Sequence, residues 1–148
     1  MNDSHRLPAA DDKAVREAER IYDSWDEALS RNDAEALLSC YASDAVLESP
    51  LVPHILGTES GVCRGHAELR SFFHKIAARK PTARRHYRTG FFTDGRKLMF
   101  EYPRETPDGE QMDFVEVMEF QDGLIQRHRV YWGWFGVRVI QKDAYHRQ

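Results

Sequence analysis

Two ionisable residues, Glu116 and His128, lie in C-terminal segments that are otherwise rich in apolar side chains. Glu116 is in "DFVEVMEF" (113–120), where strand alternation puts it on one face with Phe114 and Met118. A carboxyl group on an apolar face has to find a partner or stay protonated, because burial disfavours its charged form. The pattern predicts either a proton donor or shared-proton partner for a ligand oxygen, or a buried ion pair with an arginine or histidine.

His128 lies in "QRHRVYW" (126–132), and strand parity puts Val130 and Trp132 on its face. If the two segments pair as antiparallel neighbours, His128 comes near Glu116, and a carboxyl–imidazole pair suits general acid–base chemistry. The alternative is a histidine packed against the sheet and hydrogen-bonded to the backbone. Both interpretations are consistent with the sequence.

The composition is that of a single globular domain, with 148 residues of which 41% are hydrophobic and 30% charged. We predict a flexible arm over residues 1–10, one domain over 11–140 and a tail over 141–148. The net charge of -3 argues against nucleic-acid binding. The basic stretch "RKPTARRHYR" (79–88) is therefore interpreted as a solvated edge.

The sequence contains no pattern typical of a metal site, a cofactor site or a membrane segment. The seven histidines are scattered, without the HxH, HExxH or CxxC spacing that gathers metal ligands, so we expect no metal and no cofactor. No apolar run approaches the roughly 20 residues of a membrane span, and the start "MNDSHRLPAADDK" lacks the apolar centre of a signal peptide. We expect Cys40 and Cys63 to be reduced thiols of a cytoplasmic protein.

Helical periodicity comes first along the chain and strand alternation follows. Apolar residues at three–four spacing predict a helix from Asp11 to the "SRND" stretch (30–33); its stripe is Val15, Ala18, Tyr22, Trp25 and Leu29. We also predict helices over 33–41 and 66–79, a loop with room for a brief hairpin over 50–65, and strands over 45–49, 86–93, 97–103, 111–121 and 124–139.

This order indicates an α+β domain with helices on one side of a curved, mainly antiparallel sheet. The last two strands are apolar on both faces. One face has to cover the helices or a cavity, and the other is a candidate surface for a homodimer.

Three phrases, "NDAEALLSCYASDAVLESP" (32–50), "GHAELRSFF" (65–73) and "EVMEFQDGLIQRHRVYW" (116–132), resemble the SnoaL-like branch of the nuclear-transport-factor-2-like superfamily. The most similar enzymatic pattern is that of the ketosteroid isomerases. The resemblance runs from about Val15 to Val139. It implies a conical, half-open barrel with three helices across the concave face of the sheet, a deep apolar pocket between them, and homodimers made through the convex face.

The resemblance also implies roles for individual residues. Where the isomerase pattern has a base aspartate at the end of the first strand, this chain has Ser49. The match puts Trp25 at the tyrosine position of the oxyanion hole and Glu116 at the position of its carboxylic acid. Because the base is missing, we do not expect steroid isomerisation by that family's mechanism.

Two functional hypotheses follow. In the first, the protein binds a small apolar ligand with a carbonyl or hydroxyl, polyketide-like or steroid-like, and catalyses isomerisation, hydration, dehydration or cyclisation by proton transfer. Glu116 would stabilise or protonate the oxygen and His128 would move the proton. The predicted cavity wall is Trp25, Ser49, Phe114, Met118, Val130 and Trp132. Plain core packing is an equal alternative for Trp25. In the second hypothesis, the same fold is a non-catalytic ligand-binding or assembly module.

Overall fold

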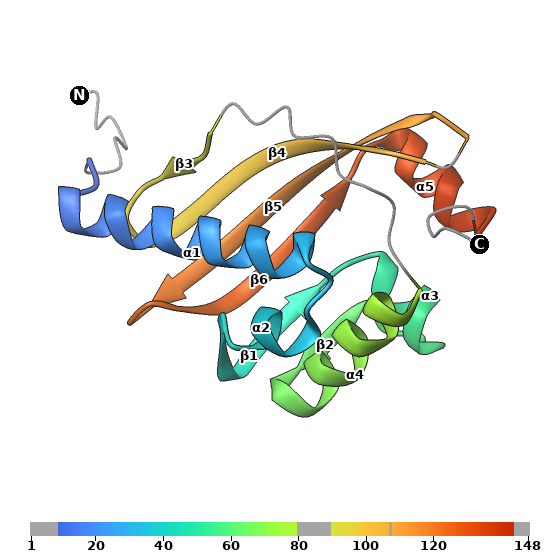
Figure 1. Cartoon of the computed structure of the whole chain (residues 1–148), viewed down its shortest axis with the longest axis horizontal. Coiled ribbons are helices and arrows are strands. Elements are labelled where there is room, and N and C mark those ends of the chain that lie inside the picture. The colour runs from blue at the N-terminus through green and yellow to red at the C-terminus, as the bar shows by residue number, and fades with distance from the viewer. Residues whose placement is uncertain (1–8, 80–89, 107, 144–148) are drawn as a thin grey trace, which may run out of the picture.

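The structure is a computed structural model that describes residues 9–79, 90–106 and 108–143. Its elements, in chain order, are α1 (Asp12–Ser30), α2 (Ala34–Leu38), β1 (Tyr41–Glu48), α3 (Leu51–Leu56), β2 (Val62–Arg64), α4 (Gly65–Ala78), β3 (Phe92–Thr93), β4 (Lys97–Glu105), β5 (Gln111–Gln121), β6 (Leu124–Trp132) and α5 (Trp134–Gln141) (Figure 1). The predicted arm (1–10) and tail (141–148) lie largely outside the described residues.

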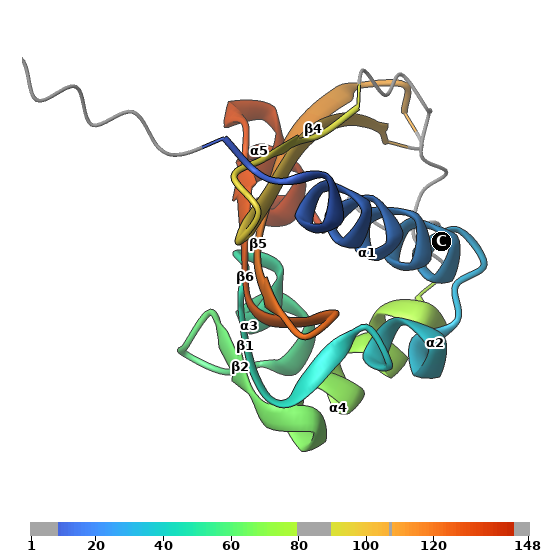
Figure 2. The same ribbon diagram turned by 90° about the vertical axis from the view of Figure 1, so that its left-hand side faces the viewer.

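The strands form one sheet in the order β2-β1-β6-β5-β4-β3. Strands β4, β5 and β6 are the antiparallel meander that the sequence predicts, whereas β1 pairs in parallel with β6, so the sheet is mixed. The described strands curve around one side without closing into a barrel, and α1 and α2 lie on that side (Figure 2). This arrangement confirms the predicted α+β class, with helices against a curved sheet.

Helix α1 is fixed at its start by a side-chain cap and along its length by aromatic packing. The carboxylate of Asp11 accepts a hydrogen bond from the backbone N–H of Ala14 at 2.8 Å, which satisfies one of the free donors of the first turn. Further along, the rings of Tyr22 and Trp25 contact Phe100 of β4, with centroid distances of 4.8 and 5.6 Å. These contacts hold the apolar stripe of α1 on the inner face of the sheet.

The segment 50–65, predicted as a loop, contains the short helix α3 and the strand β2. Pro50 and Pro53 are compatible with the helix because they lie at its N-cap and in its first turn, where the missing N–H donors are not needed. Gly57 ends the helix in the left-handed region, with φ of 68°. The prediction was wrong here because proline was interpreted only as a signal for loops.

The predicted strand over 124–139 is wrong beyond Trp132, where β6 ends. Gly133 is the N-cap of α5, and a Cβ atom on Gly136 would lie only 2.7 Å from the Trp132 ring, so glycine lets the helix approach this indole. Trp134 is exposed on α5 and does not share the face of Trp132. The apolar residues of this short segment fit helical and strand periods equally well, which explains the error.

Smaller differences concern the ends of other elements. The helix predicted over 33–41 is shorter, and Tyr41 opens β1 instead. Val15, predicted in the buried stripe of α1, is exposed. Of the strand predicted over 86–93, residues 86–89 lie outside the described residues, and β3 occupies the end. Helices α3 and α5 come in addition to the three predicted helices.

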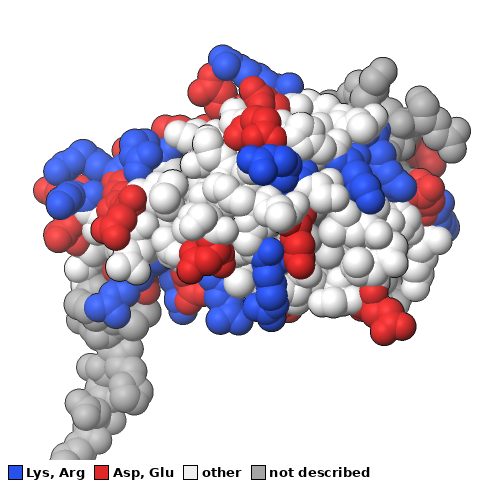
Figure 3. All heavy atoms as spheres, turned by 90° about the horizontal axis from the view of Figure 1, so that it is seen from below, with Lys and Arg blue, Asp and Glu red and all other residues white. Residues whose placement is uncertain are grey.

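The surface carries charges of both signs. Figure 3 shows acidic and basic side chains interspersed over the face of the molecule that it presents. Most of the basic stretch 79–88 lies outside the described residues. Within the part of the chain that the structure describes, no helix combines the length and apolar character needed to cross a membrane.

Candidate functional site

Glu116 lies on the inner face of β5, between Phe100 of β4 and Val130 of β6. Only 2% of the residue is exposed. Its Oε1 accepts a hydrogen bond from the hydroxyl of Tyr102 at 2.6 Å, and its Oε2 lies 2.5 Å from Nε2 of His128. The structure thus brings together the two ionisable residues to which the sequence points, and it buries both.

His128, on β6, is bonded at both ring nitrogens. Its Nδ1 lies 2.8 Å from the hydroxyl oxygen of Tyr41, at the start of β1. The indole N–H of Trp25 on α1 donates to the same hydroxyl at 3.1 Å. Together with Glu116 and Tyr102, these residues form one continuous buried chain of hydrogen bonds, which we call the relay: Trp25, Tyr41, His128, Glu116 and Tyr102.

The position of the proton on His128 determines what Tyr41 can offer. When only Nε2 is protonated, it donates to Glu116, and Nδ1 accepts a hydrogen bond from the Tyr41 hydroxyl. When Nδ1 is protonated, it donates to Tyr41, and the hydroxyl hydrogen of that tyrosine is released for another acceptor. A change of protonation at one end of the imidazole therefore changes the donor available at the other end.

Tyr41 is suited to remain the neutral partner in this chain. Burial is the largest cause that raises the pKa of its hydroxyl well above the ordinary value, and the nearby carboxyl of Glu116 raises it further. The hydrogen bond from Trp25 acts in the opposite direction. Because the net direction is upward, Tyr41 keeps its proton at neutral pH and serves as a donor.

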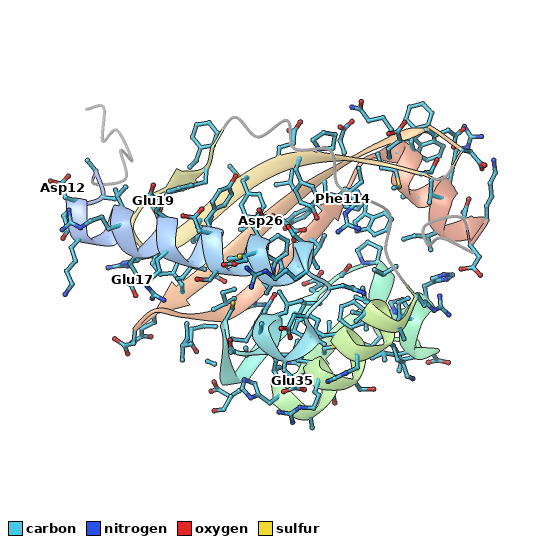
Figure 4. All side chains as sticks on the ribbon, in the orientation of Figure 1. Asp12, Glu17, Glu19, Asp26, Glu35 and Phe114 are labelled. Atoms are coloured by element: carbon cyan, nitrogen blue, oxygen red, sulfur yellow. The ribbon has the colours of Figure 1, made fainter. Side chains whose placement is uncertain are left out.

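The relay forms part of the wall of a cavity of about 70 Å³. The other lining residues come from α1, α2, α4, β1, the start of α3 and the long strands, and most are apolar: Leu29, Leu37, Leu47, Ser49, Leu51, Phe72, Phe73, Ile76, Arg104, Phe114, Val130 and Trp132. Figure 4 shows Phe114 on the strands behind α1, on the sheet side of this cavity.

The volume of the cavity limits what it can hold in this conformation. One water needs roughly 10–15 Å³, and pockets for drug-sized ligands begin at roughly 300 Å³. At about 70 Å³ the cavity lies between these limits. A compact molecule therefore fits it better than a steroid-sized one.

The structure places most of the predicted ligand-binding residues on the cavity wall: Trp25, Ser49, Phe114, Val130 and Trp132. Met118 is different, because it is fully buried between Leu98 and His128 in the neighbouring strands and belongs to the core. The hydroxyl oxygen of Ser49 accepts the backbone N–H of Leu51 at 3.2 Å. Whether any of these residues contacts a ligand stays a prediction.

Among the wall residues that were not assigned to the site from the sequence, three have polar side chains: Tyr41, Tyr102 and Arg104. The sequence left open whether Glu101 or Tyr102 faces inward, and the structure shows Tyr102 buried and Glu101 exposed. Strand alternation along β4 contains this signal, because Tyr102 and Arg104 have the parity of the buried residues Leu98 and Phe100. The uncertain length of the following hairpin obscured it.

The site has few atoms that remain available for a metal. The imidazole nitrogens of His128 and the carboxylate oxygens of Glu116 are already engaged within the relay. Across residues 9–79, 90–106 and 108–143, no three His, Cys, Asp or Glu residues are grouped so that they could hold an ion.

A family model described as the SnoaL-like domain matches residues 18–128, which is more than half of the chain. The chain belongs to the SnoaL-like family. The match spans every member of the relay, from Trp25 to His128. A search of curated proteins gives no match. The ketosteroid isomerase branch, which the sequence suggests, stays a prediction for this SnoaL-like protein.

Several solved structures have the same fold as this chain. An NTF2-like protein of unknown function from Burkholderia pseudomallei has a TM-score of 0.67 and 20% identity, covering 84% of this chain and 97% of its own. TerC, co-crystallised with polyporic acid, has a TM-score of 0.67 and 18% identity, covering 85% and 98%. The epoxide hydrolase/cyclase-like enzyme SalBIII, of pyran ring formation in the polyether salinomycin, has a TM-score of 0.59 and 19% identity, covering 82% and 94%. At these identities the likeness concerns the fold.

Proposed function

We propose that this SnoaL-like protein binds a small, largely apolar molecule with a carbonyl or hydroxyl group and catalyses proton transfer at that oxygen. The observation that supports this most strongly is the relay, which connects a carboxyl, an imidazole and two tyrosines along the wall of an apolar cavity. Reactions of this class are isomerisation, hydration or dehydration, and cyclisation. The names of two structural neighbours, a cyclase-like enzyme and a protein crystallised with polyporic acid, agree with such ligands.

The chemistry follows from the donors that face the cavity. In an enolisation, a water molecule takes the proton next to a ligand carbonyl, and the electron pair of that C–H bond moves to the carbonyl oxygen. Tyr41 donates a hydrogen bond or a proton to this oxygen, while Nδ1 of His128 supplies a proton to Tyr41. Glu116 stabilises the positive charge on His128 through Nε2. His128 thus acts through Tyr41, because both of its nitrogens are engaged.

Ligand binding is the first part of the proposal to test. A melting-temperature screen should include single-ring phenols, aryl ketones, 1,3-diketones and steroids. A ligand at 100 times its Kd adds about 2.7 kcal/mol, which corresponds to several degrees for a domain of this size. Glu116→Gln and Tyr41→Phe should lose much of that shift.

The matched control is Glu119→Gln, because Glu119 is on the same strand and pairs with Arg129 on the outer face of the sheet. This variant should keep the shift. If Glu116→Gln keeps the whole shift of every hit, the ligand does not bind at the relay. If no compound shifts the wild type, the proposal of a carbonyl or hydroxyl ligand loses its support.

A measurement of turnover distinguishes the two functional hypotheses, an enzyme and a non-catalytic binding module with the same fold. The hydrogen bond of Ser49 favours the binding module, because the serine hydroxyl, which stands where the isomerase pattern has its base, accepts a backbone N–H and is itself a poor base. For a ketone that binds, proton NMR in D₂O should show faster exchange of the C–H next to the carbonyl with wild-type protein than with Glu116→Gln. Binding without any acceleration would identify the module instead.

We also propose that the protein forms a homodimer through the convex face of the sheet. Phe92 of β3 is 74% exposed and Tyr131 of β6 is 54% exposed, and Met99, paired with Phe92, is exposed beside them. Sedimentation velocity should give the mass of a dimer for the wild type. Tyr131→Glu should shift the protein to the monomer, whereas a monomeric wild type at micromolar concentration would contradict the proposal.

We also propose that the protein is located in the cytoplasm, and the state of its two cysteine thiols supports this location. Cys40 and Cys63 are both free, the first half-buried and the second buried. Burial raises the pKa of Cys63 to about 11, so its thiol stays protonated and unreactive at neutral pH. Free, unreactive thiols suit a reducing compartment.

A further inference from the structure

A histidine outside the relay binds the backbone of one relay member. His66 lies in the first turn of α4, and its Nε2 is 2.9 Å from the carbonyl oxygen of Tyr41. A carbonyl oxygen only accepts hydrogen bonds, so Nε2 carries a hydrogen and donates it. The neutral tautomer with Nε2–H and the charged imidazole both have this donor. His66 thus connects α4 to the residue whose hydroxyl meets His128.

The backbone of β1 at Tyr41 lies beside an irregular stretch of the sheet. On one side β2 pairs with β1 at residues 46–48, so Tyr41 lies outside that pairing. On the other side β6 pairs Ile125 with Tyr41 and then Arg127 with Val46. Between these pairs β1 advances five positions, from 41 to 46, whereas β6 advances two, from 125 to 127, so β1 carries three extra residues here. Insertions of this kind disrupt the ladder locally and re-aim the side chains next to them.

The start of α4 is held close to this irregular stretch. Gly65 has a φ of 72°, and a Cβ atom there would lie 3.4 Å from the backbone oxygen of Ser43. The backbone N–H of Arg64, the N-cap of the helix, donates to Oε2 of Glu68 at 2.7 Å. The turn that carries His66 is therefore fixed at its own backbone, and it offers β1 a firmly placed donor.

We propose that His66 is a positioning residue for the relay. By binding the carbonyl of Tyr41, it keeps the tyrosine hydroxyl 2.8 Å from Nδ1 of His128. Without His66, the carbonyl of this residue, which is only 2% exposed, would have to turn toward another donor, and the side chain would turn with it. His66 is not among the described residues of the cavity wall, so it acts through Tyr41 and not on the ligand. The inference rests on the proposed function, because the relay is the acid–base unit of that proposal.

The first measurement needs no ligand. NMR of the imidazole nitrogens in the ligand-free protein reports the hydrogen bond between Tyr41 and Nδ1 of His128, and Tyr41→Phe gives the signal of His128 without that bond. His66→Leu removes the donor and should move the Nδ1 signal of His128 toward its position in Tyr41→Phe. His66→Gln should restore the wild-type signal, because its side-chain amide donates from nearly the same place as Nε2. A role of His66 in stability alone would leave this signal unchanged in the folded variant.

The second measurement follows proton exchange of acetophenone by proton NMR in D₂O, as a readout of proton transfer next to a carbonyl. His66→Leu should lower the exchange rate of the methyl protons by roughly tenfold to a hundredfold, since a displacement of about 1 Å at a reacting group has a cost of this order. In a protein that already carries Tyr41→Phe, the same change should have little further effect, because His66 acts through Tyr41. Fully additive losses would overturn the inference.

His74→Leu is the matched control, because His74 lies on the same helix and its imidazole contacts Glu35 at the surface. It should leave both the His128 signal and the exchange rate unchanged. An unchanged His128 signal in His66→Leu overturns the inference, and so does an equal response to His74→Leu. If the signal responds as expected but the wild type does not accelerate the exchange of acetophenone, the proposed catalysis fails for aryl ketones while the positioning role of His66 stands.

Discussion

Replacing His128 with leucine is expected to lower the free energy of unfolding by about 3–5 kcal/mol at neutral pH, because it leaves the buried carboxyl of Glu116 without its imidazole partner. Glu116 and His128 are each only 2% exposed, and the carboxyl would keep the hydrogen bond from the hydroxyl of Tyr102. Tyr41 would lose its imidazole partner at the same time. Urea unfolding of the two proteins measures the difference directly.

A double-mutant cycle tests whether the loss comes from the pair or from altered packing. Glu116→Gln keeps the shape of the side chain without its charge, so alone it should cost much less than His128→Leu. When His128 is already leucine, Glu116→Gln should raise the free energy of unfolding, because it removes a buried carboxylate that has lost its imidazole partner. Additive losses in the double variant would mean that the two residues do not act as a pair.

Double-mutant cycles can also be measured on ligand binding, with pairs of substitutions within the relay. If Tyr41 donates to the ligand only when Nδ1 of His128 is protonated, then the residues of the relay act as one unit. Their substitutions should have strongly non-additive effects on ligand binding. This is the behaviour expected of a hydrogen-bond chain that runs through five structural elements.

Strand alternation was sufficient to predict the inward face of Glu116 and its approach to His128. A charged residue at a position of apolar parity is a strong local signal, and the two strands are joined by the short turn at Asp122 and Gly123. The pairings of Glu116 with Val130 and of Met118 with His128 place the imidazole diagonally across from Glu116, two residues from its direct partner, as an antiparallel register allows. Which nitrogen meets which oxygen depends on side-chain geometry that alternation does not contain.

Tyr41 could not be identified as a site residue in the same way. Its contact with His128 depends on the parallel pairing of β1 with β6, between segments that are far apart in the sequence. A local period cannot reveal such pairing, whereas an antiparallel hairpin is signalled by its turn. Tyr41 also lies shortly after α2, which ends at Leu38, so its apolar position was attributed to that helix.

Ser49, which the resemblance to the isomerases placed at the position of a base, makes a local backbone contact. Its hydroxyl oxygen accepts the backbone N–H of Leu51, the first residue of α3, a helix that was not predicted, and Leu51 belongs to the cavity wall. The hydrogen-bonded polar groups of the relay that line the cavity lie instead on α1, β1, β4, β5 and β6.

Replacing Phe100 with alanine should also cost about 3–5 kcal/mol, because a fully buried phenylalanine leaves a cavity that its neighbours fill only in part. Phe100 contacts Tyr22, Trp25 and Tyr102, and it is the cross-strand partner of Glu116. The void would therefore open beneath both ends of the relay. Urea unfolding should show the loss of stability, and any ligand found in the screen should bind more weakly.

Phe135→Ala is the matched control for Phe100→Ala, because it removes the same side chain from an exposed position on α5. Its effect on stability should stay within about 0.5 kcal/mol. A comparably small effect of Phe100→Ala would contradict the packing of α1 on β4. A large loss of stability with unchanged ligand affinity would instead show that the relay itself holds Trp25 and Tyr102 in place. The hydrogen bonds from Trp25 to Tyr41 and from Tyr102 to Glu116 would then be sufficient to position these two side chains without Phe100.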